Sequence, residues 1–88
     1  MLTIWKTQLL PAGRQTIQVP AGAELLTARE QRDDICVWYH CHSDRPLEDR
    51  EIAIVGTGHE AVGSGWRYVG SASLQGGAFI FHVFERRP

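Results

Sequence analysis

The segment Gly56-Thr57-Gly58-His59 holds residue types suited to binding an anion. Two glycines around a hydroxyl residue let backbone N–H groups turn toward a common point and form a small anion-binding concavity. Thr57 adds a hydroxyl group, and His59 adds a ring that can donate to a phosphate or stack on a base. The lysine and the G-x-x-x-x-G-K-[ST] spacing of a nucleoside-triphosphate loop are absent, and no helix clearly follows. A glycine-rich turn with an exposed histidine is the alternative interpretation.

Four other side chains fit the same chemistry. Arg50, at the start of the strand that leads into this segment, adds a fixed charge and can contact a phosphate through two N–H groups. Trp38 and Trp5 offer stacking surfaces, and His82 at the centre of the last strand can line the same cleft. Because Trp38 and Tyr39 lie on opposite faces of one strand, one of them must face solvent, a ligand or another subunit. The candidate ligand-binding residues are Arg50, Thr57, Gly58, His59, Trp38, Trp5 and His82.

Histidines and cysteines in the run His40-Cys41-His42, with Cys36 nearby, supply the ligand types of zinc. Neighbouring strand residues face opposite ways, however, so Cys41 points away from both histidines and lacks the partner that a metal site or a nucleophile needs. Cys36 and Cys41, five residues apart, lie about 16 Å apart on an extended strand, beyond the reach of a disulfide. We expect reduced thiols, no metal, no cofactor and no catalytic residues.

Alternating apolar residues, bounded by turn residues, predict a mostly β chain that forms one domain over residues 1–88. The segment 23–30 also suits a short helix, but turn residues on both sides favour a strand. The expected fold is a small antiparallel sandwich or barrel of about seven strands. The predicted strands are 2–9, 14–19, 23–30, 34–42, 50–56, 66–74 and 78–85.

Composition excludes several classes of protein. The chain is 43% hydrophobic and 22% charged, which is typical of a folded domain. A formal net charge of −1 argues against a binder of DNA or RNA duplexes. No apolar run approaches the ~20 residues of a membrane span, and the N-terminus makes a poor signal peptide. We therefore expect a cytoplasmic protein without a membrane contact, and its small core favours a homo-oligomer, a dimer or a tetramer.

Five blocks along the chain carry a resemblance: Ile4–Lys6, Ile17–Leu26, Ile35–Trp38, Val55–His59 and Gly77–Glu85. In these blocks, which include the GTGH and FHVFE stretches, the sequence resembles a family of small tailed-phage proteins that is similar to the anti-CBASS sponge proteins. Those proteins bind cyclic nucleotide immune signals without cutting them and act as small oligomers. The resemblance implies a phage or prophage immune-evasion protein of the host bacterial cytoplasm that sequesters a cyclic oligonucleotide. The run Tyr39–His42 departs from the more apolar form expected there, which bears on the ligand preference.

Two functions of other classes remain open from the sequence. The first is a small protein-binding module that inhibits a host factor through an exposed strand edge or an aromatic patch. Residues 31–60 hold seven acidic residues against three arginines, which would suit a basic target. The second is a minor structural or accessory protein without a ligand. A bound nucleotide or a bound host protein, detected in the purified protein, would separate these alternatives.

Overall fold

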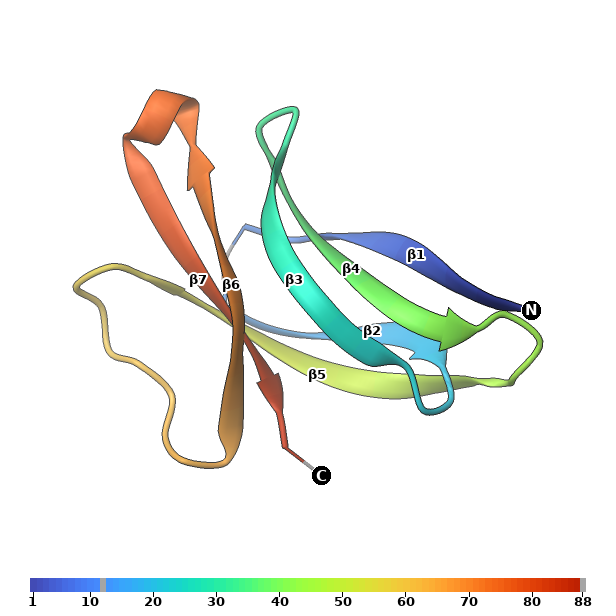
Figure 1. Ribbon diagram of the computed structural model, residues 1–88. Coiled ribbons are helices and arrows are strands. Elements are labelled where there is room, and N and C mark those ends of the chain that lie inside the picture. The colour runs from blue at the N-terminus through green and yellow to red at the C-terminus, as the bar shows by residue number, and fades with distance from the viewer. Residues whose placement is uncertain (12, 88) are drawn as a thin grey trace.

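The computed structural model describes residues 1–11 and 13–87 and contains seven strands with one short 3-10 turn (Figure 1). The prediction of a mostly β, antiparallel fold of about seven strands is therefore confirmed. In the described part of the chain, no helix has the length and apolarity needed to cross a membrane. The elements are β1 (Leu2–Leu9), β2 (Gly13–Pro20), β3 (Glu24–Gln31), β4 (Asp34–His42), β5 (Leu47–Gly56), β6 (Trp66–Leu74), η1 (Gln75–Gly77) and β7 (Phe79–Arg86).

The strand bounds agree with the sequence prediction to within one residue, except at the start of β5. The strand β5 begins at Leu47 rather than at residue 50, because Leu47, Glu48 and Asp49 pair with the end of β2. The connection between β6 and β7 is a 3-10 turn, in which Gly76 and Gly77 both take positive φ angles. The ambiguous segment 23–30 forms β3, so the helix alternative is wrong.

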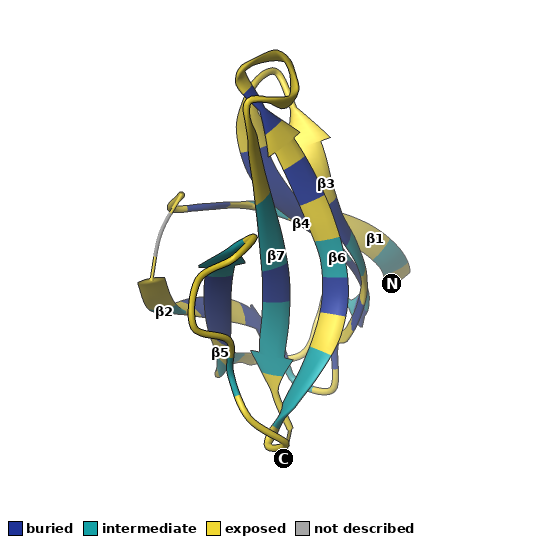
Figure 2. Cartoon of the chain, turned by 90° about the vertical axis from the view of Figure 1, so that its left-hand side faces the viewer, coloured by how far each residue is buried: buried dark blue, intermediate teal, exposed yellow. Residues whose placement is uncertain are grey.

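The strands form a three-stranded sheet of order β1-β4-β3 and a four-stranded sheet of order β2-β5-β7-β6. Alternate residues of each sheet point inward and pack against the other sheet, and Figure 2 shows buried and exposed bands following one another along β6. Four valines and isoleucines at the centre have no exposed surface: Val19, Val37, Ile52 and Val83. The side chains on the opposite, outer face of the four-stranded sheet therefore lie outside the core between the sheets.

The edges β3 and β6 approach each other closely and close the domain on one side. A Cβ atom on Gly70 of β6 would collide with the backbone of Ala28 on β3, so the approach requires a glycine there. The guanidinium of Arg67 donates to the Leu25 carbonyl oxygen at 2.9 Å across the same junction. On the other side, no ladder joins β1 to β2 within the described residues, so both of these edges stay open.

Candidate functional site

A hydrogen-bonded chain of three side chains lies on the outer face of the four-stranded sheet. The Thr57 Oγ1 atom is 2.7 Å from His82 Nε2, and the Tyr68 hydroxyl oxygen is 2.8 Å from His82 Nδ1. The Tyr68 ring also packs edge-on against Phe84, with 5.2 Å between ring centres. Both ring nitrogens of His82 are therefore engaged, and the exposed Tyr68 presents an aromatic surface together with a polar group.

Each neutral tautomer of His82 donates to one hydroxyl group and accepts from the other. If Nδ1 carries the proton, the ring donates to Tyr68, which keeps its own phenolic proton for a ligand. If Nε2 carries the proton, Thr57 keeps its proton, but the Ile80 carbonyl oxygen at 3.4 Å competes for it. The cluster thus offers a hydroxyl donor to a ligand in either state, with Tyr68 as the better placed donor.

The predicted turn forms beside this chain. The backbone N–H of His59 donates to the Gly56 carbonyl oxygen at 3.0 Å, and Gly58 takes a φ of 88°, which favours glycine. The His59 ring lies against Gly56, since a Cβ there would be 3.1 Å from His59 Nδ1. Four candidates from the sequence therefore lie together, where the end of β5 meets the middle of β7: Thr57, Gly58, His59 and His82.

Tyr68 is a member of this cluster that the sequence reasoning missed. A β-bulge between Tyr68 and Gly70 shifts the register, so Tyr68 lies opposite Phe84 while Ser71 lies opposite His82. Strict alternation from the buried Ala72 and Leu74 would have turned Tyr68 into the core. The glycine at position 70 was the available signal, because an isolated glycine inside a strand pattern often marks a bulge or a close backbone approach.

A second group of side chains lies further along the same outer face. The guanidinium carbon of Arg14 lies 5.1 Å from the Trp66 ring centre, and that of Arg86 lies 5.4 Å from it. Arg86 also pairs with Glu51 at 3.8 Å, whereas Arg14 has no carboxylate within ion-pair distance among the residues described. Two cations over one indole make this end of the face positive and aromatic.

A hollow of about 340 Å³ shares Arg14 with the second group, and Val55 in its lining pairs with His82 of the first. Its floor is formed by Ala53 and Val55 of β5, and its walls include Arg14 from β2 and Glu60 from the loop after β5. Ala53 pairs with Arg14 on one side and with Phe84 on the other, which places the hollow on the outer face. Its volume is at the lower end of the roughly 300–1,000 Å³ range of small-molecule sites.

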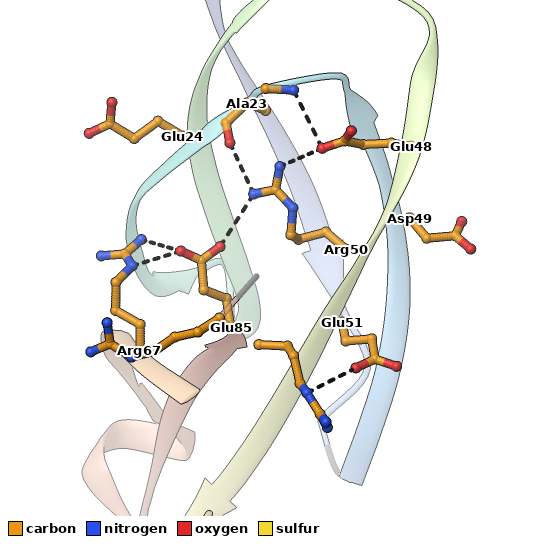
Figure 3. A pocket seen from close by; sticks show the side chains of 11 residues that line it. Ala23, Glu24, Glu48, Asp49, Arg50, Glu51, Arg67 and Glu85 are labelled. Carbon is orange, nitrogen blue, oxygen red and sulfur yellow. Dashed lines mark hydrogen bonds and ion pairs between the residues drawn. The ribbon is translucent and has the colours of Figure 1, made fainter. Parts of the chain in front are cut away.

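Arg50 does not join this cluster. It lies six residues before Gly56 on β5, about 20 Å away along the strand. Its guanidinium donates to the Ala23 carbonyl oxygen at 2.9 Å, to Glu48 at 2.9 Å and to Glu85 at 3.4 Å (Figure 3). Glu85 also accepts from Arg67 at 2.7 Å, and this network links the two sheets at one end of the core.

A groove of about 830 Å³ surrounds that network but suits an anion poorly. Its lining holds five carboxylates and four guanidiniums: Glu24, Glu48, Asp49, Glu51 and Glu85 against Arg50, Arg67, Arg86 and Arg87. Arg50 already donates to three acceptors. An anionic ligand would have to displace carboxylates from their cations, so we assign this groove a role in holding the sheets together.

Acid should weaken one contact of this network. Hydrogen bonds from the Arg50 guanidinium and then from the Gly22 N–H hold the pKa of Glu48 below its ordinary value of 4.5. A carboxyl group with a lowered pKa stabilises the fold above its unfolded pKa, and this stabilisation is lost as the pH falls through the folded value. We expect Glu48→Gln to lower the melting temperature slightly near neutral pH and to have no effect below both pKa values.

The control for this prediction is Glu24→Gln, because Glu24 lines the same groove and forms no ion pair within 4 Å in the described structure. Melting curves recorded by circular dichroism across the acid range measure both variants. An equal loss of stability from Glu48→Gln at neutral and at acidic pH would contradict a stabilising role of the ionised Glu48 carboxylate.

The two candidate tryptophans belong to the other sheet. Trp38 on β4 faces outward beneath Arg29, whose guanidinium carbon is 5.4 Å from the ring centre, while Trp5 lies on β1 opposite Tyr39. Tyr39 is 3% exposed, and its hydroxyl lies 2.8 Å from that of Thr7. Of the Trp38–Tyr39 pair, Trp38 is therefore the outward residue, and neither tryptophan lies on the sheet that carries Thr57 and His82.

Both cysteines are free and buried. Burial raises the pKa of the Cys36 thiol, which disfavours the reactive thiolate. Over residues 1–11 and 13–87, no three histidine, cysteine or acidic side chains gather in a way that could hold a metal ion.

These features define a small antiparallel β-domain of two sheets, with a polar and aromatic outer face on its four-stranded sheet. The chain belongs to the family described as a domain of unknown function, DUF7352, whose sequence pattern matches residues 1–88. No curated protein and no solved structure matches the chain.

Proposed function

We propose that this protein binds a cyclic oligonucleotide on the outer face of its four-stranded sheet and holds it intact, as a phage or prophage sponge in the bacterial cytoplasm. The observation that carries the proposal is the Thr57–His82–Tyr68 chain, which lies on the same sheet face as Trp66 with its two guanidiniums. Nucleotides need stacking surfaces for their bases and donors for their phosphates. This face supplies both.

The spacing along β7 favours a ligand with more than one nucleotide unit. His82 and Arg86 are four residues apart on this strand, which separates them by about 13 Å. A single phosphate contacts one end of such a face, whereas a cyclic oligonucleotide presents several bases and phosphates together. The hollow over Ala53 and Val55, which pair with Phe84 and His82 of β7, gives the ligand a recessed surface beside this strand.

Binding without cleavage is part of the proposal. Thr57 and His82 lie at the distance of a nucleophile and its base, but the third group at His82 is the Tyr68 phenol. A phenol lacks the negative charge by which a carboxylate stabilises the imidazolium formed during catalysis. Ligand recovered intact after heating the complex would support sequestration, and a linear product would show an enzyme instead.

Removing a donor or a cation from this face should weaken binding. We expect His82→Ala, Tyr68→Phe and Arg14→Ala each to cost roughly 1–3 kcal/mol of binding free energy, because each removes a hydrogen bond or a charge contact with the ligand. Titration calorimetry measures the change, and the melting temperature should move little. The matched control is Arg29→Ala, which removes a guanidinium from Trp38 on the other sheet.

Equal losses from Arg14→Ala and Arg29→Ala would contradict the placement of the ligand. The variant Arg50→Ala offers a further contrast, because Arg50 binds carboxylates and a carbonyl between the sheets. We expect this substitution to lower stability rather than affinity.

The direct test of the ligand class is a native mass spectrum of protein purified from bacteria that make cyclic nucleotides. We expect a retained mass that matches a cyclic oligonucleotide. The rival function, a module that inhibits a host protein, has support from the exposed apolar side chains of β1. A host protein bound in place of a nucleotide would overturn the sponge proposal in favour of this rival.

A further inference from the structure

The strand β1 is the open edge of the three-stranded sheet. The other edge of that sheet, β3, is covered by β6, and β1 makes no ladder with β2 in the described structure. An edge strand presents unpaired backbone N–H and C=O groups that another strand can satisfy. Folded proteins protect such edges with prolines, bulges or several charges. The register of β1 on β4 is regular, and Leu2–Leu9 contains no proline and one charged residue, Lys6.

Three of the five exposed side chains of β1 are apolar. Ile4 and Leu2, on the outer face of the sheet, are 55% and 53% exposed. Trp5 points to the opposite side, as its partner Tyr39 does, yet it is 39% exposed while Tyr39 is buried. Among the described residues no strand lies beyond β1, so the indole is left partly exposed on that side. A neighbouring strand would bury apolar surface on both faces of the sheet at once.

We propose that β1 pairs antiparallel with β1 of a second copy of this chain, so that the two three-stranded sheets become one continuous sheet. Two identical strands related by a two-fold axis perpendicular to the sheet form a closed, self-complementary pair. Residues that lie opposite each other in such a pair share a face of the sheet.

Charge selects the register of this pair. With the axis at Trp5, the two indoles face each other, Ile4 lies opposite the partner's Lys6, and the two lysines stay apart. With the axis moved by one residue to Lys6, the two lysines would be direct neighbours, and like charges opposite each other destabilise a sheet. The axis at Trp5 also brings two aromatic rings together, which is a favourable cross-strand pair.

The pairing involves none of the strands that carry the proposed ligand face, because that face belongs to β2, β5, β6 and β7 of the other sheet. Dimer formation and ligand binding can therefore be measured separately. A negative result for the dimer would leave the proposed ligand binding standing, and the reverse also holds.

The experiment is sedimentation velocity on the full chain and on three variants. We expect the unsubstituted protein to sediment as a dimer of its 9.9 kDa chain at micromolar concentration. The variant Ile4→Lys places like charges opposite each other in two symmetry-related pairs, and we expect it to weaken the dimer by about tenfold or more. The variant Ile4→Glu places a carboxylate opposite Lys6 of the partner and should keep the dimer.

The third variant, Leu26→Lys, is the matched control, because Leu26 is 45% exposed but lies on β3 at the far edge of the same sheet. It should leave the dimer unchanged. A monomeric unsubstituted protein would overturn the proposal, as would a loss of the dimer in Leu26→Lys equal to that in Ile4→Lys. If Ile4→Lys and Ile4→Glu both dissociated the dimer, the proposed register with the axis at Trp5 would be wrong.

Discussion

Replacing Gly70 with alanine should lower the free energy of unfolding by about 2–3 kcal/mol, near the upper range for overpacked sites. The new Cβ would meet the carbonyl oxygen of Ala28 and lie 2.7 Å from its backbone nitrogen. Backbone atoms cannot turn aside as the end of a flexible side chain can, so β3 and β6 must separate. Their separation would also stretch the bond from Arg67 to the Leu25 carbonyl.

The matched control is Gly63→Ala, in the loop between β5 and β6. A Cβ at this position meets nothing within 4 Å, and its φ lies outside the left-handed region. We expect the free energy of unfolding to change by no more than about 1 kcal/mol. The expected change is an increase, because alanine restricts the unfolded chain more than glycine does. Chemical denaturation measures both variants. Equal stability of Gly70→Ala and the unsubstituted protein would contradict the close approach of β3 and β6.

Replacing Glu85 with glutamine should cost roughly 1.5–3 kcal/mol of unfolding free energy, the range for hydrogen bonds to charged groups. The Glu85 side chain is 12% exposed and accepts from both Arg50 and Arg67. The neutral amide leaves two guanidiniums at the end of the core without their shared carboxylate. Arg50 would keep Glu48 as a counterion. The lost stability therefore comes mainly from the contacts that Glu85 of β7 makes with the two guanidiniums.

The control variant is Glu51→Gln, because Glu51 pairs with Arg86 at 3.8 Å and both side chains are more than half exposed. Exposed pairs contribute about 0–1 kcal/mol, so this change should be small. Denaturant titrations of the two variants compare them directly. If Glu51→Gln costs as much as Glu85→Gln, the network between the sheets does not have the role assigned to it.

The strand pattern was readable from the sequence because alternation and turn residues are local signals. Ile52 and Ile54 marked one face of β5, and both are buried in the core. The start of β5 was not readable in this way. Residues 47–49 look like a polar loop, but they become strand because β2 extends beside them as far as Pro20. Pairing with a distant strand can override local composition.

Part of the candidate site could be predicted from the sequence, again because local signals mark it. The Gly56–His59 turn is a local motif, and His82 reaches it because β5 and β7 are neighbours. The position of Tyr68 depends on a bulge, which moves it to the outer face against the alternation of its neighbours. Arg50 had the right chemistry for a phosphate, but the topology brings Glu85 to it from β7, thirty-five residues away in the chain. Long-range pairing of this kind leaves no local mark in the sequence.

The most direct test of the proposed function is isothermal titration of the unsubstituted protein with a panel of cyclic di- and trinucleotides, beside the Arg14→Ala and Arg29→Ala variants. We predict heat of binding with at least one member, a weaker association for Arg14→Ala and an unchanged one for Arg29→Ala. The ligand should be recovered intact from the complex. The absence of heat with every member of the panel would contradict the account.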